Sequence, residues 1–201
     1  MDIAKIVLEG THVRLEPLST AQHATGLAAA VSDGELWKNP VTFVPSPDQL
    51  EVFCEAAETA FRQQRELAFA TIDKISGAIA GCTRFRCIER AHRRLEIGST
   101  FLGRSRQRTH INTGAKYLML EHAFERWGCN RVELLTDVLN TQSRTAIARI
   151  GAMQEGVLRG HMVRRDGSIR DSVIFSITAA EWPAVKTALA NKLRAHDITP
   201  A

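Results

Sequence analysis

The sequence predicts one α+β domain, residues 1–201, in which helices flank a mixed and mostly antiparallel sheet. Three observations predict this fold class. Three strand-like segments follow one another between residues 67 and 102, as in an antiparallel meander. A long helix with an apolar face then separates them from another buried strand, as in a crossover unit. Near the C-terminus, two further strand-like segments flank Asp166-Gly167, a dipeptide typical of hairpin turns.

The N-terminal third predicts one strand followed by two helices. Residues 13–18 (VRLEPL) alternate apolar and polar side chains, which indicates a strand. A helix is expected over residues 20–32, and the loop after it carries Trp37. Ser46 is a suitable N-cap for the second helix, because a proline fits its first turn and Gln49 can close a capping box.

The central part predicts three strands, a loop and a long helix. The strands cover residues 67–73, 78–88 and 93–102. The loop runs from Gly103 to about Ile111, and the helix runs from Asn112 to Trp127. Gly128 then provides the stop signal, because glycine readily adopts the left-handed conformation that ends many helices.

The C-terminal third predicts a strand, a short helix, a hairpin and a last helix. In order, these elements cover residues 131–137, 140–150, 156–165, 168–177 and 181–193. The complete predicted order is therefore β α α β β β α β α β β α.

The composition is that of a globular, cytoplasmic protein. Apolar residues make up 44% of the chain and charged residues 24%, which are ordinary values for a packed domain. No apolar run approaches the ~20 residues that cross a bilayer, and the N-terminal segment lacks a secretory pattern. We therefore expect a cytoplasmic location and no membrane partner. The four cysteines and seven histidines are scattered, and they predict neither disulfides nor a metal site.

A net charge of +4 and an isoelectric point near 9.1 favour an acidic ligand. The arginines concentrate at residues 104–108 and 159–170. Nucleic acid is one acidic ligand class, and an anionic nucleotide cofactor is another. Nucleic acid is the weaker candidate, because only 6% of the residues are aromatic and no base-stacking row is evident.

The loop before the long helix is a candidate anion site. It consists of Gln107, Arg108, Thr109, His110, Ile111 and Asn112, with Thr113 following. Backbone N–H groups at a helix N-terminus converge on one point, and the helix dipole adds partial positive charge there. Such a site suits a pyrophosphate. The same pattern also fits a plain solvent-exposed loop that Asn112 caps.

A second polar pair follows the strand at residues 131–137. Asn140 is a suitable N-cap, and Ser143 occupies the third position of the helix after it, so both side chains face the same helix end. Taken alone, this pair predicts a helix cap and nothing more.

Together these elements resemble the GNAT N-acyltransferase superfamily, and within it the RimJ/RimL-like branch. The resemblance covers nearly the whole chain and depends on the order and spacing of EIG at 96–98, QRTHINTGAK at 107–116, HAFERWGCNRVELLTD at 122–137, NTQS at 140–143, RIGA at 149–152 and EGVLRGH at 155–161. The phosphate loop departs from the family pattern Q/R-x-x-G-x-G/A, because His110 and Asn112 stand where small residues are expected. Thr109, Asn112, Ala115 and Lys116 resemble the T-x-x-N-x-x-A-K version of one branch.

The resemblance implies transfer of an acetyl group from acetyl-CoA to a primary amine by direct attack in a ternary complex. The loop at 107–113 would hold coenzyme A, with Asn140 on its pantetheine arm. Glu96 would be the general base. Many relatives use a tyrosine after the Asn motif as the acid, but Tyr117 is the only tyrosine here and lies in the earlier helix. Ser143 is therefore the expected substitute.

The resemblance also implies an acceptor pocket. It would include Trp37, Arg84, His161 and Asp171 beside Glu96, and the acceptor would be a protein N-terminus or a small amine. The resemblance also implies a homodimer formed through the C-terminal strands. Two alternatives stay open: a CoA-binding regulatory domain with little catalysis, and an acyltransferase that uses another donor such as succinyl-CoA.

Overall fold

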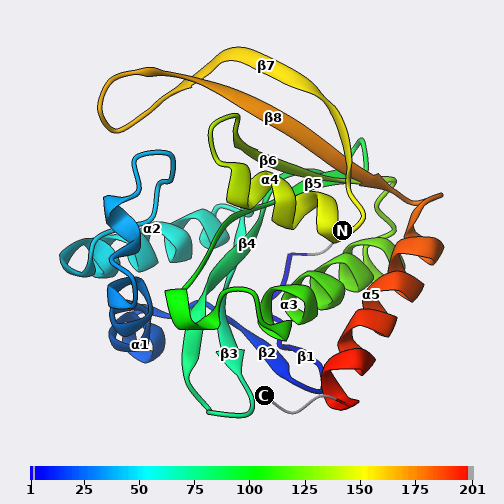
Figure 1. Cartoon of the computed structure of the whole chain (residues 1–201), viewed down its shortest axis with the longest axis horizontal. Helices are drawn as coiled ribbons and strands as arrows, with labels where there is room; N and C mark the ends of the chain where they lie inside the picture. Colours follow the sequence, from blue (N-terminus) through cyan, green and yellow to red (C-terminus); the bar gives the residue numbers. More distant parts are fainter. Residues whose placement is uncertain (2, 199–201) are drawn as a thin grey trace.

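An eight-stranded sheet in the order β1-β2-β3-β4-β5-β6-β8-β7 organises the fold (Figure 1). The computed structural model describes residues 1 and 3–198, with the backbone alone for residues 196–198. The strands are β1 (Leu8–Glu9), β2 (Val13–Pro17), β3 (Leu67–Asp73), β4 (Ile79–Glu89), β5 (Arg94–Leu102), β6 (Arg131–Asp137), β7 (Met153–Val163) and β8 (Ile169–Thr178). Neighbouring strands run antiparallel except β5 and β6, which are parallel.

The helices are α1 (Thr20–Ser32), α2 (Leu50–Arg62), α3 (His110–Glu121), α4 (Thr141–Arg149) and α5 (Trp182–Ile198). Short 3-10 turns cover Leu36–Lys38, Pro47–Gln49 and Arg104–Arg106, and a π-helical turn at His122–Arg126 extends α3. The predicted order of elements is confirmed, with one strand added before it.

Several details differ from the sequence prediction: β7 begins at Met153 rather than at residue 156, and α5 continues to Ile198 rather than ending at residue 193. The two-residue strand β1 was not expected, because two residues are too few to show a periodicity. The long helix begins at His110 rather than Asn112, and Thr109 is its N-cap. Asn112 is therefore not the cap: the Thr109 hydroxyl accepts a hydrogen bond from the Ile111 amide at 3.3 Å, which starts the helix two residues earlier.

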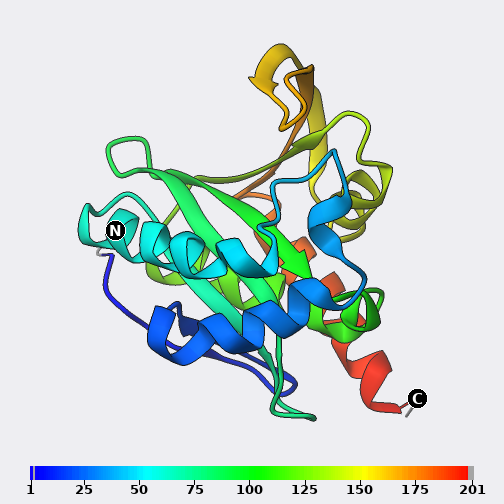
Figure 2. The same ribbon diagram turned by 90° about the vertical axis from the view of Figure 1, so that its left-hand side faces the viewer.

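Helices cover both faces of the sheet. α1 and α2 pack on one face, over a cluster that includes Leu27, Leu50, Ala70 and Phe101. α3 and α5 pack on the other face, over a larger cluster that includes Phe69 and many other side chains from the sheet. The two views show this three-layer arrangement, with α1 and α2 on the opposite side of the sheet from α3 (Figures 1 and 2).

The parallel pair β5–β6 separates after a short stretch of pairing. Only three residue pairs align, the last of them Glu96 with Glu133, although β5 continues to Leu102 and β6 to Asp137. A β-bulge in β5 accompanies the separation: Ser99 has a φ of 48°, and two residues of β5 lie opposite one residue of β4. Beyond Glu96, the facing edges of the two strands have no ladder partner, and a gap opens in the sheet.

The β7–β8 hairpin arches over this gap and is tied down by arginines from its far end (Figure 1). Arg164 donates to both carboxylate oxygens of Asp137, at 2.7 and 3.0 Å. Arg165 donates to the backbone carbonyl of Val44 at 2.6 Å, which joins the hairpin to the loop between α1 and α2. Two of the arginines in the second sequence cluster therefore serve the fold.

We expect Asp137→Asn to lower the free energy of unfolding by about 3 kcal/mol near neutral pH, because it leaves the Arg164 guanidinium without its buried partner. Burial alone would raise the pKa of Asp137, but hydrogen bonds from Arg164 and the Leu139 amide, with the charges of Arg164 and Arg170, together lower it below 3.8. A carboxyl with a lowered pKa stabilises the fold above its unfolded pKa and loses this effect as the pH falls.

The difference between wild type and Asp137→Asn should therefore shrink below about pH 4 in denaturant titrations. Asp48→Asn, at an exposed aspartate before α2, is the matched control. A difference in the free energy of unfolding between wild type and Asp137→Asn that stays constant down to pH 2 would contradict this account.

Candidate active site

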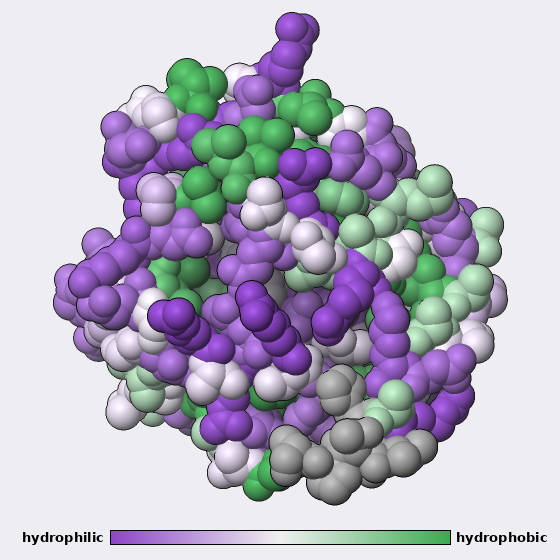
Figure 3. Space-filling model, viewed as in Figure 1, coloured by the Kyte–Doolittle hydropathy of each residue, from purple (hydrophilic) through white to green (hydrophobic). Residues whose placement is uncertain are grey.

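A cavity of about 1890 Å³ occupies the gap between β5 and β6. Its walls come from residues after the point of separation on both strands, from the N-terminal ends of α3 and α4, from the loop between α1 and α2, and from the β7–β8 hairpin. In the space-filling view it appears as a hollow in the middle of this face, with a mostly hydrophilic rim (Figure 3). The gap in the sheet thus provides a cavity large enough for a ligand.

One end of the cavity is the N-terminus of α3. The Thr109 hydroxyl accepts from the Ile111 amide, and the Asn112 amide also lies in the first turn of α3, ahead of the regular helical hydrogen bonds. Arg108 adopts a φ of 63°, a left-handed conformation that bends the chain immediately before the helix. Backbone donors and the helix dipole therefore favour an anion at this end.

The side chains around this loop divide into two groups. Arg104 and Arg108 are exposed and line the cavity, where they add positive charge. Arg106 instead donates to Asp73 at 2.7 Å and is tied to the turn after β3. Gln107 accepts from Gln142 at 2.7 Å and donates to the Leu102 carbonyl at 2.9 Å, so it links the loop to both α4 and the end of β5.

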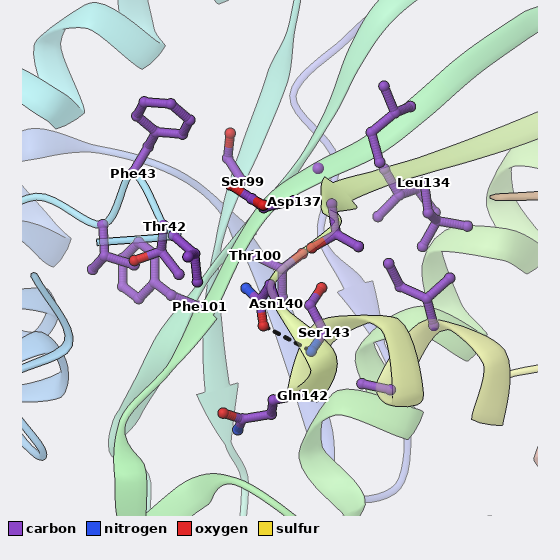
Figure 4. Close-up of a pocket in the computed structure, with 18 of the residues that line it drawn as sticks. Thr42, Phe43, Ser99, Thr100, Phe101, Leu134, Asp137, Asn140, Gln142 and Ser143 are labelled. Atoms are coloured by element: carbon purple, nitrogen blue, oxygen red, sulfur yellow. Dashed lines mark hydrogen bonds between the residues drawn. The ribbon is translucent and has the colours of Figure 1, made fainter. Parts of the chain in front are cut away.

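The second wall begins at α4. Asn140 is its N-cap, and the Asn140 side-chain oxygen accepts from the Ser143 amide at 3.0 Å. Both residues line the cavity, and they converge on the same part of it as Thr100 from β5 (Figure 4). The predicted N-cap is confirmed. Capping uses the side-chain oxygen of Asn140 and not its NH2 group. The Ser143 hydroxyl has no partner among the residues that the structure describes.

Glu96 lies at the other end, where β5 and β6 part, and its residue is 8% exposed. Its carboxylate approaches the Arg86 guanidinium at 3.9 Å and accepts a weak bond from the Cys87 thiol at 3.7 Å. A side chain at Gly98 would come within 2.4 Å of this carboxylate, so glycine there leaves room for it. Burial raises the pKa of Glu96, and the charge of Arg86 only partly opposes this effect.

A third set of polar side chains surrounds Glu96. Glu133 lies beside it on β6 but is held by Arg94 and Arg131, at 3.3 and 2.8 Å. Arg170, from β8, is buried under the ring of Phe43 and donates to Ser172 at 2.9 Å. Positive and negative groups therefore alternate around this end of the cavity.

The structure brings most of the predicted site residues to one cavity. Those that line it are Glu96, Gln107, Arg108, Thr109, Asn112, Asn140, Ser143 and His161. The predicted base, the phosphate loop and the pair Asn140 and Ser143 come from three separate elements. All of them border the gap between β5 and β6.

Six predicted residues do not line the cavity. Ile111 and Thr113 are buried under the first turn of α3, and the His110 ring lies beside His12 with centroids 5.0 Å apart. Trp37 packs against the α1–α2 cluster. Arg84 is buried against Glu66, at 2.8 Å, and the Phe53 ring. Asp171 accepts from the Gly160 amide at 2.7 Å on β7.

Several residues that line the cavity were not predicted from the sequence. Arg86, Glu133 and Arg170 were missed because strand alternation does not tell which polar side chain faces a ligand. Lys116 was noted only as part of a motif. It is 4% exposed and donates to Thr83 and Thr100, at 3.0 and 2.7 Å. A lysine among the apolar positions of a buried helix face was the available signal.

No helix among the described residues is long and apolar enough to span a membrane. Within the same residues, no group of three or more His, Cys, Asp or Glu side chains is arranged to hold a metal ion.

Comparisons with known proteins agree with this architecture. The family model described as "Acetyltransferase (GNAT) domain" matches residues 12–153. A Bacillus subtilis protein named "Putative ribosomal N-acetyltransferase YdaF" is 26% identical over 150 residues, which cover 72% of this chain and 79% of that protein.

Solved structures are also similar. A GCN5-related N-acetyltransferase from Brucella melitensis is 34% identical with a TM-score of 0.87, covering 94% of this chain and 86% of the other. RimJ from Mycobacterium smegmatis, solved in complex with CoA-disulfide, is 25% identical with a TM-score of 0.75, covering 94% and 92%.

The buried Lys116 predicts a dependence of stability on pH. Burial lowers its pKa from 10.5 to about 7. Between these values the unfolded chain keeps the proton that the folded chain has lost, so raising the pH stabilises the fold. We expect the free energy of unfolding of wild type to rise across this range relative to that of Lys116→Met. Lys192→Met, at an exposed lysine of α5, is the control, and parallel curves for wild type and Lys116→Met would contradict the burial of a titrating amine.

Proposed function

This chain belongs to the GNAT acetyltransferase family, and we propose that it transfers the acetyl group of acetyl-CoA to a primary amine by direct attack in a ternary complex. One observation carries the proposal. A single cavity joins an anion-binding helix N-terminus to a buried carboxylate, and it passes through a gap between parallel strands. The long charged carrier of the thioester needs the anion-binding end. The amine, which must lose a proton, needs the end with the carboxylate.

The residues present fit coenzyme A. The Asn112 amide lies in the first turn of α3, and Arg104 and Arg108 add charge beside it, which suits a diphosphate. Asn112 contributes a backbone donor here, and the His110 ring lies outside the cavity. The departure from glycine in the loop is thus compatible with anion binding. The pantetheine arm would lie in the gap, with amide groups bonded to the free strand edges and to Asn140.

Glu96 is the proposed general base. An ammonium group must lose a proton before it attacks, and a carboxylate with a raised pKa accepts that proton more readily than an ordinary glutamate does. Burial supplies that raised pKa, and the alternating charges around Glu96 supply contacts for the acceptor. The carbon of the thioester then forms a bond to nitrogen, and its bond to sulfur breaks.

Two further requirements are charge stabilisation on the thioester oxygen and a proton for the departing thiolate. Backbone N–H groups of β5 beyond Glu96 have no partner on β6, so they are available to the oxygen. Tyr117 is excluded as the acid because its hydroxyl donates to Glu121 at 3.1 Å and it does not line the cavity. Ser143, which does line it, is the hydroxyl that the sequence predicts for this role.

The acceptor is proposed to be a protein N-terminus or a small amine. The names of the relatives support the first, because one is called a ribosomal N-acetyltransferase and another is RimJ. The acceptor end of the cavity lies between the α1–α2 loop and the β7–β8 hairpin, both of which reach the surface. Exposed residues such as Phe43 and Met162 border this end and offer apolar contacts to a peptide.

We expect calorimetry to detect acetyl-CoA binding, weakened about fivefold in Arg108→Ala, because an exposed charge contact contributes about 1 kcal/mol. The loss should be smaller at high salt, since the contact is exposed. Arg159→Ala, at an exposed arginine of β7 that does not line the cavity, should bind like wild type. If the wild-type protein has no affinity for acetyl-CoA, the proposed function is wrong. Tight binding without turnover of any amine would favour a regulatory domain.

We also expect Glu96→Gln to lower kcat about 100-fold or more with little change in acetyl-CoA affinity, because it removes the proton acceptor. In wild type, the rate should fall as the pH drops through the raised pKa of Glu96, and this limb should be absent in the variant. Glu133→Gln is the matched control, because it changes a neighbouring carboxylate that two arginines already hold. Equal losses in both variants would argue against a specific base.

A further inference from the structure

A buried amine and two hydroxyls form a closed cluster under the gap in the sheet. The Lys116 ammonium donates to Thr83 at 3.0 Å and to Thr100 at 2.7 Å. The two threonine hydroxyls are bonded to each other at 2.8 Å, and Thr83 also contacts the Met119 sulfur at 3.6 Å. Lys116 makes no ion pair with any carboxylate of the described residues.

This cluster has more donor hydrogens than hydrogen-bond contacts. In its protonated form the Lys116 amine carries three hydrogens and each hydroxyl one, whereas the cluster contains the four contacts just described. At least one hydrogen on Lys116 or Thr100 is therefore without an acceptor among the described residues. Buried donors normally find partners, so an unspent donor on a side chain that is 4% exposed points to a ligand.

A ligand can reach this cluster from the cavity. Lys116 and Thr100 both line it, whereas Thr83 is fully buried and does not. Thr100 follows the bulge at Ser99 and is exposed, although it sits in the middle of the sheet, because β6 has already turned away. It occupies the same part of the cavity as Asn140 and Ser143 (Figure 4). The thioester would have to pass this point between the helix ends and Glu96.

We propose that Thr100 donates the proton that the departing CoA thiolate needs, and that Lys116 supplies it to Thr100. The inference rests on the proposed function. When the carbon–sulfur bond breaks, its electron pair stays on sulfur, which takes the hydroxyl proton of Thr100. The Thr100 oxygen takes a proton from the Lys116 ammonium, which becomes a neutral amine and regains a proton from solvent after the thiol leaves. Thr100 is the catalytic residue, and Lys116 acts through it.

The chemistry of the cluster suits this role better than an isolated hydroxyl does. A threonine or serine hydroxyl alone is too weak an acid to protonate a thiolate, so it needs a proton source behind it. Ser143 has no such source among the described residues, whereas Thr100 has an ammonium at 2.7 Å. Burial also lowers the pKa of Lys116 to about 7, which makes it a stronger proton donor than an ordinary lysine.

The test uses hydroxylamine as acceptor, because this nucleophile is unprotonated at neutral pH and needs no general base. Release of free CoA thiol from saturating acetyl-CoA is measured against pH for wild type, Lys116→Met and Thr100→Val. We expect both variants to release thiol about 100-fold more slowly. In wild type the rate should fall on the alkaline side, well below the usual range of a lysine, and this limb should disappear in Lys116→Met.

Three further variants make the test specific. Thr100→Ser keeps the hydroxyl and should restore most of the rate. Thr83→Val removes the other hydroxyl bonded to Lys116, on the side away from the cavity, and should cost much less than Thr100→Val. Ser143→Ala separates the two candidate acids. Calorimetry with acetyl-CoA on each variant shows whether a slower rate reflects binding instead of proton transfer.

The outcomes distinguish the two proposals. If wild type binds no acetyl-CoA or releases no thiol, the proposed function fails and this inference with it. If wild type turns over but Lys116→Met and Thr100→Val keep its rate and its alkaline limb, the proposed function stands and this inference is wrong. The inference is also wrong if Thr83→Val loses as much activity as Thr100→Val, or if Ser143→Ala alone abolishes release.

Discussion

The early end of hydrogen bonding between β5 and β6 is the constraint on which the rest of this structure depends. Backbone N–H and C=O groups in the middle of a sheet normally find partners on the next strand. After the pair Glu96 and Glu133, β5 and β6 no longer provide hydrogen-bond partners for each other. The unpaired edges need an alternative, and an extended arm with amides of its own provides one. The gap is tolerated because the remaining strands still pair on either side.

Several elements cooperate to hold the gap open. The bulge at Ser99 turns β5, and the hydrogen bonds of Gln107 to Leu102 and Gln142 keep the end of β5 and α4 at a set distance. On the far side, Arg164 and Asp137 attach the β7–β8 hairpin to the end of β6. Each contact joins separate elements of the chain, so the cavity depends on the whole fold.

The charges along the cavity follow a gradient that matches the proposed reaction. Helix amides and exposed arginines make the α3 end positive, where a diphosphate carries its charge. At the opposite end, Glu96 is removed from water and stays available for a proton. Lys116 lies between these ends with a proton that no carboxylate holds. Burial thus shifts a base and an acid in opposite directions, so that each tends toward its neutral form.

The amino-acid sequence by itself determined most elements and their order, because helical and strand periodicities, the Asn140 cap and the Asp166-Gly167 turn are local properties. It also predicted the family and the residues that form the ends of the cavity. Only the tertiary structure decided that Trp37, Arg84 and Asp171 face away from it, and that Arg86, Arg170 and Thr100 face into it. Strand alternation says that two side chains share a face, but which face meets a ligand depends on where a neighbouring strand ends. The start of α3 at His110 was settled by the Thr109 side chain, and the importance of Lys116 by two threonines on other elements.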